Sequence, residues 1–483
     1  MPKTNIKFQN SNKSSDNQHF NKDTADLSNE REDIKRGLKK YRIVMSFLSI
    51  PIIIIGIYLL PRKNPQNQNQ VSQVTVESKE LNQATNQAKL AVKLGKSAKT
   101  KNQWLTAAKT WEKSIAQMKA ISAESESYDL AQKKIVEYQN YLNIARDRAK
   151  TATSNMTLVK TIRGDISPKS IVHSGNGLFF AQNMMYNHTI TVYDRAYNLV
   201  KTISDRVQLS DYEHGKSQGM YQGSPVEASF SHNGKYAWVS NYQMYGDGFN
   251  RPGYDKCPSG NYDPSYLYRI NTNTLEKEQV IPVGSVPKFN AASPDNRLVL
   301  VSNWCSYDMS IIDTQTNQEI KRLKLGRYPR GIAIVSNSEK AYVAIMGSTD
   351  IAVVNLKDPE FKVSWLKNIG VSPRHLNIAP TGNYLYTSLS GEGNVAKINL
   401  STNKIVSKVR TGNVPRSMVL SDNGEFLYVV NYKSNTASRI RTKDMKVMQT
   451  VRTDPNPIGI TYDSKTHQVW VACYSGSLMV FQA

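Results

Sequence analysis

Basic side chains recur at one position of the sequence, directly after a series of regularly placed prolines. The prolines stand at positions 168, 225, 287, 329, 373, 415 and 457. In five of these seven places the next residue is a cation: Lys169, Lys288, Arg330, Arg374 and Arg416. Repeats that close into a ring would bring these residues to the mouth of its central channel, where five cations would attract anions. Arginine can hold a carboxylate or phosphate through two parallel hydrogen bonds. We therefore predict that these residues bind a ligand.

A structural interpretation of the same cations stays open. A repeated arginine at the start of a strand can cap carbonyl groups of the neighbouring repeat, and structural positions recur as readily as functional ones. His375 follows Arg374 and is a further candidate at the same mouth, as an acid or a base. No Ser, Cys or carboxylate partner stands at a recognisable spacing from this histidine, so a packed strand residue is the simpler interpretation. No catalytic residue is assigned.

The three cysteines indicate one disulfide and one free thiol. Cys257 and Cys305 fall in predicted loops of neighbouring repeats, whereas Cys473 falls on a predicted strand. An odd number of cysteines is most simply one pair and one remainder. We therefore expect Cys257 to be bonded to Cys305, which would fit an oxidising compartment.

An insertion at 243–266 is the longest departure from the repeat pattern. It carries residue types that ligate hard cations: Asp247, Asn250, Asp255, Asn261 and Asp263. Their spacing is not that of an EF-hand, which favours a plain loop over a calcium site. The seven histidines are scattered and no Cys/His spacing suits zinc. The sequence therefore predicts no metal and no cofactor, and a loop that shapes or covers a ligand pocket.

The elements that position these residues are short strands in a long repeat. The last five prolines are separated by 42, 44, 42 and 42 residues. Each begins an apolar strand, followed by a polar turn, a second alternating strand, and two more strands with a turn between them. A period near 42 with four strands per unit is typical of the blades of a β-propeller. The repeats predict an all-β, seven-bladed propeller over residues 156–483.

The two ends of this region indicate how the ring closes. The seventh repeat ends with its third strand at 478–481, and its fourth strand is missing there. The segment MTLVKTIRG at 156–164 has the form of KIVSKVRTG at 404–412, which is a fourth strand. We expect the strand at 156–163 to complete the last blade and remove its open edge.

Three second strands end in a related motif: AWVSNY (237–242), VLVSNW (299–304) and LYVVNY (427–432). These segments resemble the Tyr-Val-x-Asn signature of the YVTN-type β-propeller repeat family, which is related to the YncE-like and lactonase-like propellers. The resemblance covers about two thirds of the chain and implies a fold more than a function. Because the Asn–aromatic pairs repeat, we interpret them as blade structure, although Trp304 could stack on a sugar or another ring.

The segment before the propeller has helical periodicity. Apolar residues follow steps of three and four in stretches around 81–91, 104–118 and 128–145, which places each set along one side of a helix. These stretches predict an α-helical hairpin or coiled-coil stalk at 76–150, after a polar linker at 61–75. Such a stalk could also support oligomerisation.

An uncharged apolar run stands at 43–60, IVMSFLSIPIIIIGIYLL. Its 18 residues are near the length that crosses a bilayer, and no cleavage site for a signal peptidase follows it. More basic residues precede the run than follow it, which predicts that the tail at 1–42 is cytoplasmic. The polar composition of this tail predicts that it is disordered. The sequence therefore predicts a signal anchor in the inner or plasma membrane, with a periplasmic or extracellular C-terminal domain, and suggests a bacterium.

The charge of the chain bears on its partners. The formal net charge is +23, which suits an anionic polysaccharide, lipid headgroups or nucleic acid, with nucleic acid the least favoured. The favoured hypothesis is a non-enzymatic, membrane-anchored binding or scaffold module for an anionic ligand or a protein of the cell envelope. The alternative is a lactonase-like hydrolase of a small ester or lactone, as the family resemblance implies.

Overall fold

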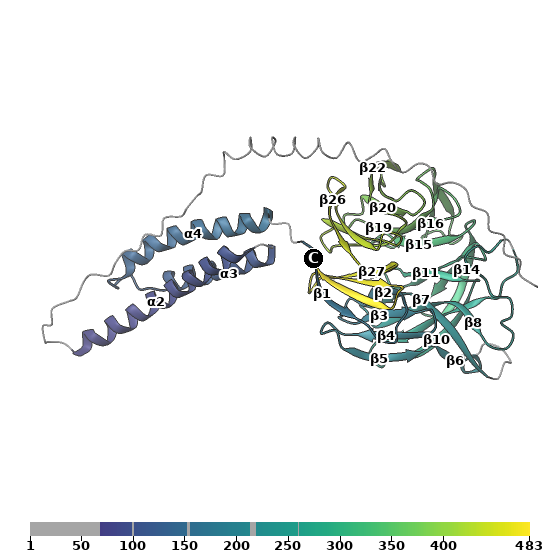
Figure 1. Ribbon diagram of the computed structural model, residues 1–483, viewed down its shortest axis with the longest axis horizontal. Coiled ribbons are helices and arrows are strands. Elements are labelled where there is room, and N and C mark those ends of the chain that lie inside the picture. The colour runs from purple at the N-terminus through teal and green to yellow at the C-terminus, as the bar shows by residue number, and fades with distance from the viewer. Residues whose placement is uncertain (1–67, 99–100, 152–154, 213–218, 259) are drawn as a thin grey trace, which may run out of the picture. The chain divides into compact units, whose positions relative to one another are not determined.

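The computed structural model describes residues 68–98, 101–151, 155–212, 219–258 and 260–483. This part of the chain begins with three helices and continues as short strands that form seven sheets (Figure 1). Every strand pair within a sheet is antiparallel, with successive strands joined as hairpins, apart from the sheet that the first strand completes. The prediction of a seven-bladed β-propeller is confirmed.

The helices are α2 (Gln68–Ser97), α3 (Lys101–Lys119) and α4 (Tyr128–Thr151). Helix α2 thus begins inside the segment predicted as a linker. Small residues of α2, such as Ala84, pack with Trp111 of α3 and Tyr138 of α4 in one apolar cluster. The Ser114 hydroxyl donates a hydrogen bond of 2.7 Å to the carbonyl oxygen of Ala84. The three helices therefore form a small bundle with its own core.

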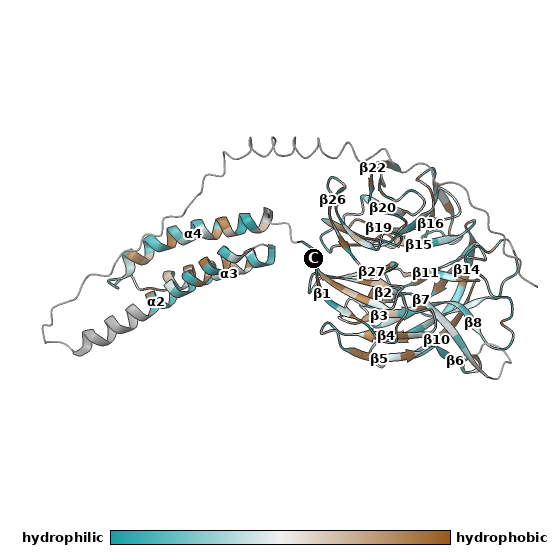
Figure 2. Cartoon of the chain, in the orientation of Figure 1, coloured by the Kyte–Doolittle hydropathy of each residue, from teal (hydrophilic) through white to brown (hydrophobic). Residues whose placement is uncertain are grey.

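The prediction of a single-pass membrane protein is corrected. Within residues 68–151, as far as they are described, no helix is long and apolar enough to cross a membrane. Helices α3 and α4 carry hydrophilic and hydrophobic residues side by side (Figure 2), which is typical of helices that bury one side against a protein neighbour. The run 43–60 and the tail 1–42 lie outside the described residues. A location in the plasma membrane is not supported.

Four strands build each blade, and the first of them lies nearest the axis. Blade one contains β2 (Pro168–His173), β3 (Phe179–Asn183), β4 (Thr189–Tyr193) and β5 (Leu199–Ser204). Blade two contains β7 (Met220–Ser231), β8 (Tyr236–Tyr245), β9 (Ser265–Asn271) and β10 (Glu276–Val283), with a fifth strand β6 (Arg206–Gln208) beside β7. Blade three contains β11 (Pro287–Ala292), β12 (Leu298–Asn303), β13 (Asp308–Asp313) and β14 (Gln318–Lys324).

The remaining blades follow the same order. Blade four contains β15 (Pro329–Ile334), β16 (Lys340–Ile345), β17 (Ile351–Asn355) and β18 (Val363–Leu366). Blade five contains β19 (Pro373–Ile378), β20 (Tyr384–Leu389), β21 (Asn394–Asn399) and β22 (Lys404–Arg410). Blade six contains β23 (Pro415–Leu420), β24 (Phe426–Asn431), β25 (Thr436–Arg441) and β26 (Lys446–Arg452). Six of the seven inner strands begin at a repeat proline, which fits a position that does not donate to the ladder.

Blade seven joins the two ends of the propeller. Its strands are β27 (Pro457–Asp463), β28 (Gln468–Cys473), β29 (Ser477–Gln482) and β1 (Thr157–Ile162). Strand β1 pairs antiparallel with β29, with Thr157 opposite Gln482. The side chain of Gln449, on the outer strand of blade six, accepts a 2.6 Å hydrogen bond from the Met156 amide and donates one of 3.0 Å to its carbonyl oxygen. The start of the propeller is therefore held by blades six and seven.

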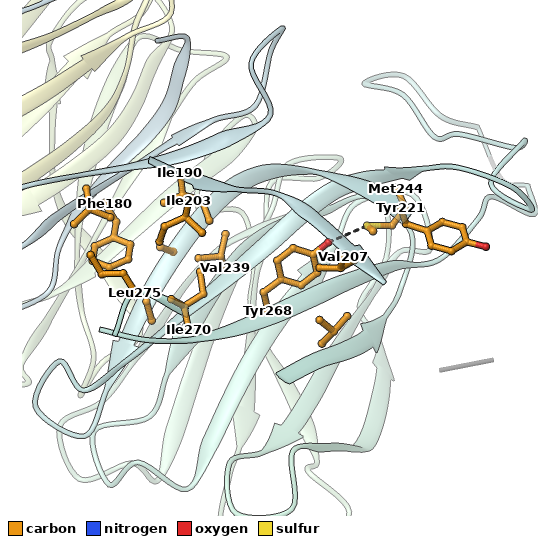
Figure 3. Close-up of a cluster of buried hydrophobic side chains, with 14 of the residues drawn as sticks. Phe180, Ile190, Ile203, Val207, Tyr221, Val239, Met244, Tyr268, Ile270 and Leu275 are labelled. Carbon is orange, nitrogen blue, oxygen red and sulfur yellow. Dashed lines mark hydrogen bonds between the residues drawn. The ribbon is translucent and has the colours of Figure 1, made fainter. Parts of the chain in front are cut away.

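Apolar side chains fill the space between neighbouring blades. Figure 3 shows Phe180, Ile190 and Ile203 of blade one packed towards Val239 and Ile270 of blade two. These five side chains are at most 4% exposed. A four-stranded sheet cannot bury both of its faces alone, so each blade depends on the blade at either side.

Removal of β1 should destabilise the propeller, because the edge of β29 would lose its partner. We expect a chain that starts at residue 164 to unfold at a temperature lower by more than about 5 °C than one that starts at residue 155. Circular dichroism during heating measures this difference. Equal unfolding temperatures for the two chains would contradict closure by β1.

Candidate functional site

The inner strands bring the five predicted cations to one cavity. Neighbouring inner strands contact each other in sequence around the ring, and β27 contacts β2. A cavity of about 660 Å³ lies at the end of the channel where these strands begin. Its lining includes all five cations: Lys169, Lys288, Arg330, Arg374 and Arg416. The structure thus places them together, whereas their role in binding stays a prediction.

Small residues and hydroxyl groups fix the backbone beneath the cations. A Cβ atom on Gly331 would lie 2.6 Å from the carbonyl oxygen of Arg374, so glycine allows β15 and β19 to approach closely. The Ser302 hydroxyl of blade three donates a 2.6 Å hydrogen bond to the carbonyl oxygen of Arg330 in blade four. Ser388 of blade five makes the same contact with Arg416 of blade six, at 2.8 Å. The cations therefore project from a rigid, hydrogen-bonded wall.

Lys288 is held by an acidic partner and two aromatic rings. Its ammonium is paired with the carboxylate of Asp255, and it lies 4.7 Å from the ring centroids of both Tyr242 and Trp304. These distances are within the range of a cation–π interaction. Burial lowers the pKa of Lys288 to about 8, with the charges of Arg330 and Arg374 acting in the same direction and Asp255 opposing them.

The three arginines differ in how they are held. Arg330 is 5% exposed and donates to the backbone carbonyl of Lys288, so the structural interpretation applies to part of its guanidinium. Arg374 approaches the sulfur of Met346 at 3.5 Å. Arg416 lies over the ring of Tyr432, 3.5 Å from its centroid, and its buried Nε has no hydrogen-bond partner among the described residues. Arg374 and Arg416 therefore retain hydrogen-bonding capacity for a ligand.

The cations repel one another, and this repulsion disfavours their charged forms. Burial lowers the pKa of Arg374 well below its usual value, and the neighbouring charges of Arg416 and Arg330 lower it further. Burial also lowers the pKa of Arg330 to about 10, with Glu227 opposing the shift and Arg416 adding to it. Because arginine keeps its proton in proteins, these directions indicate an unfavourable cluster of like charges. A bound anion would relieve this repulsion.

Asp255 supplies an acidic group within the lining. The side chain is exposed at the rim of the cavity. Partial desolvation would raise its pKa, but the charge and hydrogen bond of Lys288, with the charges of Lys169 and Arg374, hold the pKa at about 2. Asp255 is therefore ionised over the physiological range, and it occupies part of the positive cavity as a carboxylate.

A second set of lining residues lies at or near the end of the second strand of the blades, and apart from Trp304 it was not predicted as a site. Six of the seven equivalent positions line the cavity: Met184, Tyr242, Trp304, Met346, Tyr432 and Tyr474. Trp304 also stacks on Tyr328, with ring centroids 4.4 Å apart. The repeated Asn–aromatic pairs were the sequence signal for this set. In each pair the asparagine belongs to the blade structure, and the residue after it lines the cavity.

The inserted loop is pinned over the cavity. Cys257 and Cys305 form the predicted disulfide, which is confirmed, with Cα atoms 5.7 Å apart. The Trp304 indole donates to the carbonyl oxygen of Asp255 at 3.1 Å, and the Tyr307 hydroxyl donates to the carbonyl oxygen of Cys257 at 2.7 Å. Cys473 is a buried free thiol, and burial raises its pKa to about 12. The loop therefore presents Asp255 in a defined position.

The other candidates lie elsewhere. His375 is not among the cavity-lining residues, and its ring packs edge-on against Phe289 with centroids 5.3 Å apart. Burial lowers its pKa to about 3, and Arg330 and Arg374 add to this effect. Asp263 of the loop is paired with Arg251 at 3.3 Å. Over the described ranges, no group of three or more His, Cys, Asp or Glu side chains is arranged to hold a metal ion.

Comparison with known proteins establishes the fold and goes no further. No protein-family model matches the chain, and no curated protein matches it. Among solved structures it is similar to hydrazine synthase of Kuenenia stuttgartiensis, with a TM-score of 0.53 and 13% sequence identity. The match covers 67% of this chain and 97% of that one. The propeller is thus supported, whereas the resemblance to the YVTN-type family is not confirmed.

Loss of the disulfide should weaken the fold. The bond links residues 48 apart in sequence, and a closed loop of this length corresponds to a stabilisation of about 4 kcal/mol from the lower entropy of the unfolded chain. We expect a reducing dithiol to lower the unfolding temperature of the wild-type protein but not that of a C257A/C305A variant, by differential scanning fluorimetry. A dithiol effect of equal size in both proteins would show that the bond does not contribute.

Proposed function

We propose that the propeller is a binding module for a small anionic ligand, which it holds in the axial cavity between the cations and the aromatic residues. The observation that carries this proposal is that five basic side chains, three of them buried and two half-buried, surround one open cavity. Buried charges are normally paired with opposite charges. Asp255 and Glu227 are carboxylates whose negative charges oppose the positive charge of the cluster, and both act on Arg330.

The size and chemistry of the cavity indicate a class of ligand. Its volume of about 660 Å³ lies within the range of about 300–1,000 Å³ that is usual for small-molecule sites. Arg374 and Arg416 suit the oxygens of a carboxylate, phosphate or sulfate group. Trp304 and Tyr432 would contact a sugar or another flat group next to that anion. A charged component of the cell envelope is one source of such a ligand.

The disulfide supports a compartment for this activity. A bond between Cys257 and Cys305 forms and persists in an oxidising environment. The basic cavity would there meet anionic saccharides and metabolites rather than the nucleotide pool of a reducing compartment. The lactone hydrolysis raised by the family resemblance has no arrangement of described residues in its favour, and binding is the function we propose.

Removal of three arginines should abolish binding. We expect inorganic phosphate to raise the unfolding temperature of the wild-type protein, because a ligand that binds only the folded state stabilises it. The shift should disappear in an R330A/R374A/R416A variant, measured by scanning fluorimetry. As a matched control, K443A/K446A/R452A removes three exposed cations of blade six and should keep the shift. A phosphate shift that persists in the first variant would contradict the proposed site.

Binding should also weaken as pH rises through 8. Lys288 has a pKa of about 8 in the folded protein, so its ammonium loses its proton between pH 7 and pH 9 and the cavity loses a positive charge. We expect sulfate, whose charge is constant in this range, to bind roughly tenfold more weakly at pH 9, as for the loss of one charged hydrogen bond. Isothermal titration calorimetry at both pH values measures this change.

The same pKa predicts a change in stability. Because the folded pKa of Lys288 lies below its usual value of 10.5, the unfolded chain binds more protons between pH 8 and 10.5. The contribution of Lys288 to the free energy of unfolding should therefore rise with pH in this window. In K288M both pH effects should be reduced, whereas K443M should behave as wild type. Sulfate affinity that is independent of pH in the wild-type protein would contradict the role of Lys288.

A further inference from the structure

Lys169 differs from Lys288, the other buried lysine that lines the cavity, in having no ion pair. It is 7% exposed and lines the cavity, yet its ammonium makes no hydrogen bond or ion pair with any residue that the structure describes. Lys288, at the equivalent position of blade three, is paired with Asp255. The two lysines share the same place in the repeat and differ in their partners. A buried amine without an ion pair tends towards its neutral form, and such a group beside a cavity is a candidate for a functional role.

The groups around Lys169 favour the neutral amine. Burial lowers the pKa of Lys169 well below its usual value, and the charges of Arg330, Arg374, Arg416 and Lys288 all act in the same direction. Glu227 is the acidic group that interacts with it, and burial raises the pKa of Glu227 against the opposing charges of Arg330 and Lys169. Burial therefore shifts both groups of this pair towards their neutral forms.

A lysine beside other cations in a desolvated pocket is an activated nucleophile for carbonyl compounds. We propose that Lys169 forms a reversible imine with a small carbonyl compound that carries an anionic group, such as a 2-oxo acid. The cavity arginines would hold the carboxylate, as they hold the anion in the proposed function on which this inference rests. The carbonyl carbon would then face the amine of Lys169 across the same cavity.

The reaction needs no oxidant or reductant. The nitrogen lone pair of Lys169 attacks the carbonyl carbon, a C–N bond forms, and the proton that the nitrogen then releases is taken up at the carbonyl oxygen, which gives a carbinolamine. The hydroxyl group of this intermediate is protonated by Glu227 or by solvent and leaves as water. The nitrogen returns its second proton to the same acid, and a C=N bond remains. Water reverses each step. The cations around the amine would also raise the electrophilicity of a bound carbonyl group.

Reductive trapping tests this inference on the full chain. The protein is incubated at pH 7 with pyruvate and sodium cyanoborohydride, which transfers a hydride to an imine and leaves a stable secondary amine. Peptide mapping by mass spectrometry then locates the adduct. We expect Lys169 to be labelled at least about tenfold faster than any exposed lysine, since each unit of lowered pKa exposes about tenfold more neutral amine. Inorganic phosphate should suppress this labelling.

Four variants make the assignment specific. K169R keeps a positive charge at the position but cannot form a stable imine, and it should show no adduct there. K443R alters an exposed lysine of blade six and should keep both the adduct on Lys169 and the stabilisation by phosphate. K256R and K288R test the other two lysines that line the cavity, and the adduct on Lys169 should still form in both. Labelling spread evenly over exposed lysines, or confined to Lys288, would overturn the inference.

Phosphate stabilisation, measured in parallel, separates this inference from the proposed function. A phosphate shift in unfolding temperature without an adduct on Lys169 would refute the imine and leave the anion-binding proposal standing. An adduct on Lys169 without a phosphate shift would support the imine and refute the anion site. Absence of both would overturn both proposals.

Discussion

The pairing of β1 with β29 is the contact on which the ring depends. Each blade buries its faces against its neighbours, so an open ring would leave blades seven and one without support on one side. The chain solves this by using a strand from its beginning as the outer strand of its last blade. Closure also sets the distance between the inner strands. The cavity exists at its observed width because all seven inner strands are held around one axis.

The cation cluster results from that geometry and also destabilises it. A residue type repeated directly after the proline of the inner strands is brought together at one end of the channel, and the like charges of Arg330, Arg374 and Arg416 oppose folding. The aromatic rings of Trp304 and Tyr432 and the carboxylate of Asp255 reduce this repulsion only in part. The remaining positive potential is available to a ligand, which is the physical basis of the proposed function.

The regular spacing of the repeat prolines predicted most of the fold. Prolines spaced by about 42 residues mark the inner strands, and equivalent positions such as Arg330 and Arg374 must meet near the axis whatever the details of the blades. The second lining set was harder to find, because methionine replaces the aromatic residue at Met184 and Met346. The contact of Asp255 with Lys288 could not be predicted, since it comes from an insertion that has no counterpart in other repeats. The membrane helix inferred from hydropathy alone is not supported by any described helix.

Anomalous diffraction from crystals soaked in selenate would show whether the axial cavity binds an anion. Selenate has the shape and charge of sulfate, and selenium locates it without ambiguity. We expect an anomalous peak inside the axial cavity, at hydrogen-bonding distance from the guanidinium groups of Arg374 and Arg416. Selenate bound only at the outer surface, with an ordered cavity that contains no peak, would refute the proposed anion site.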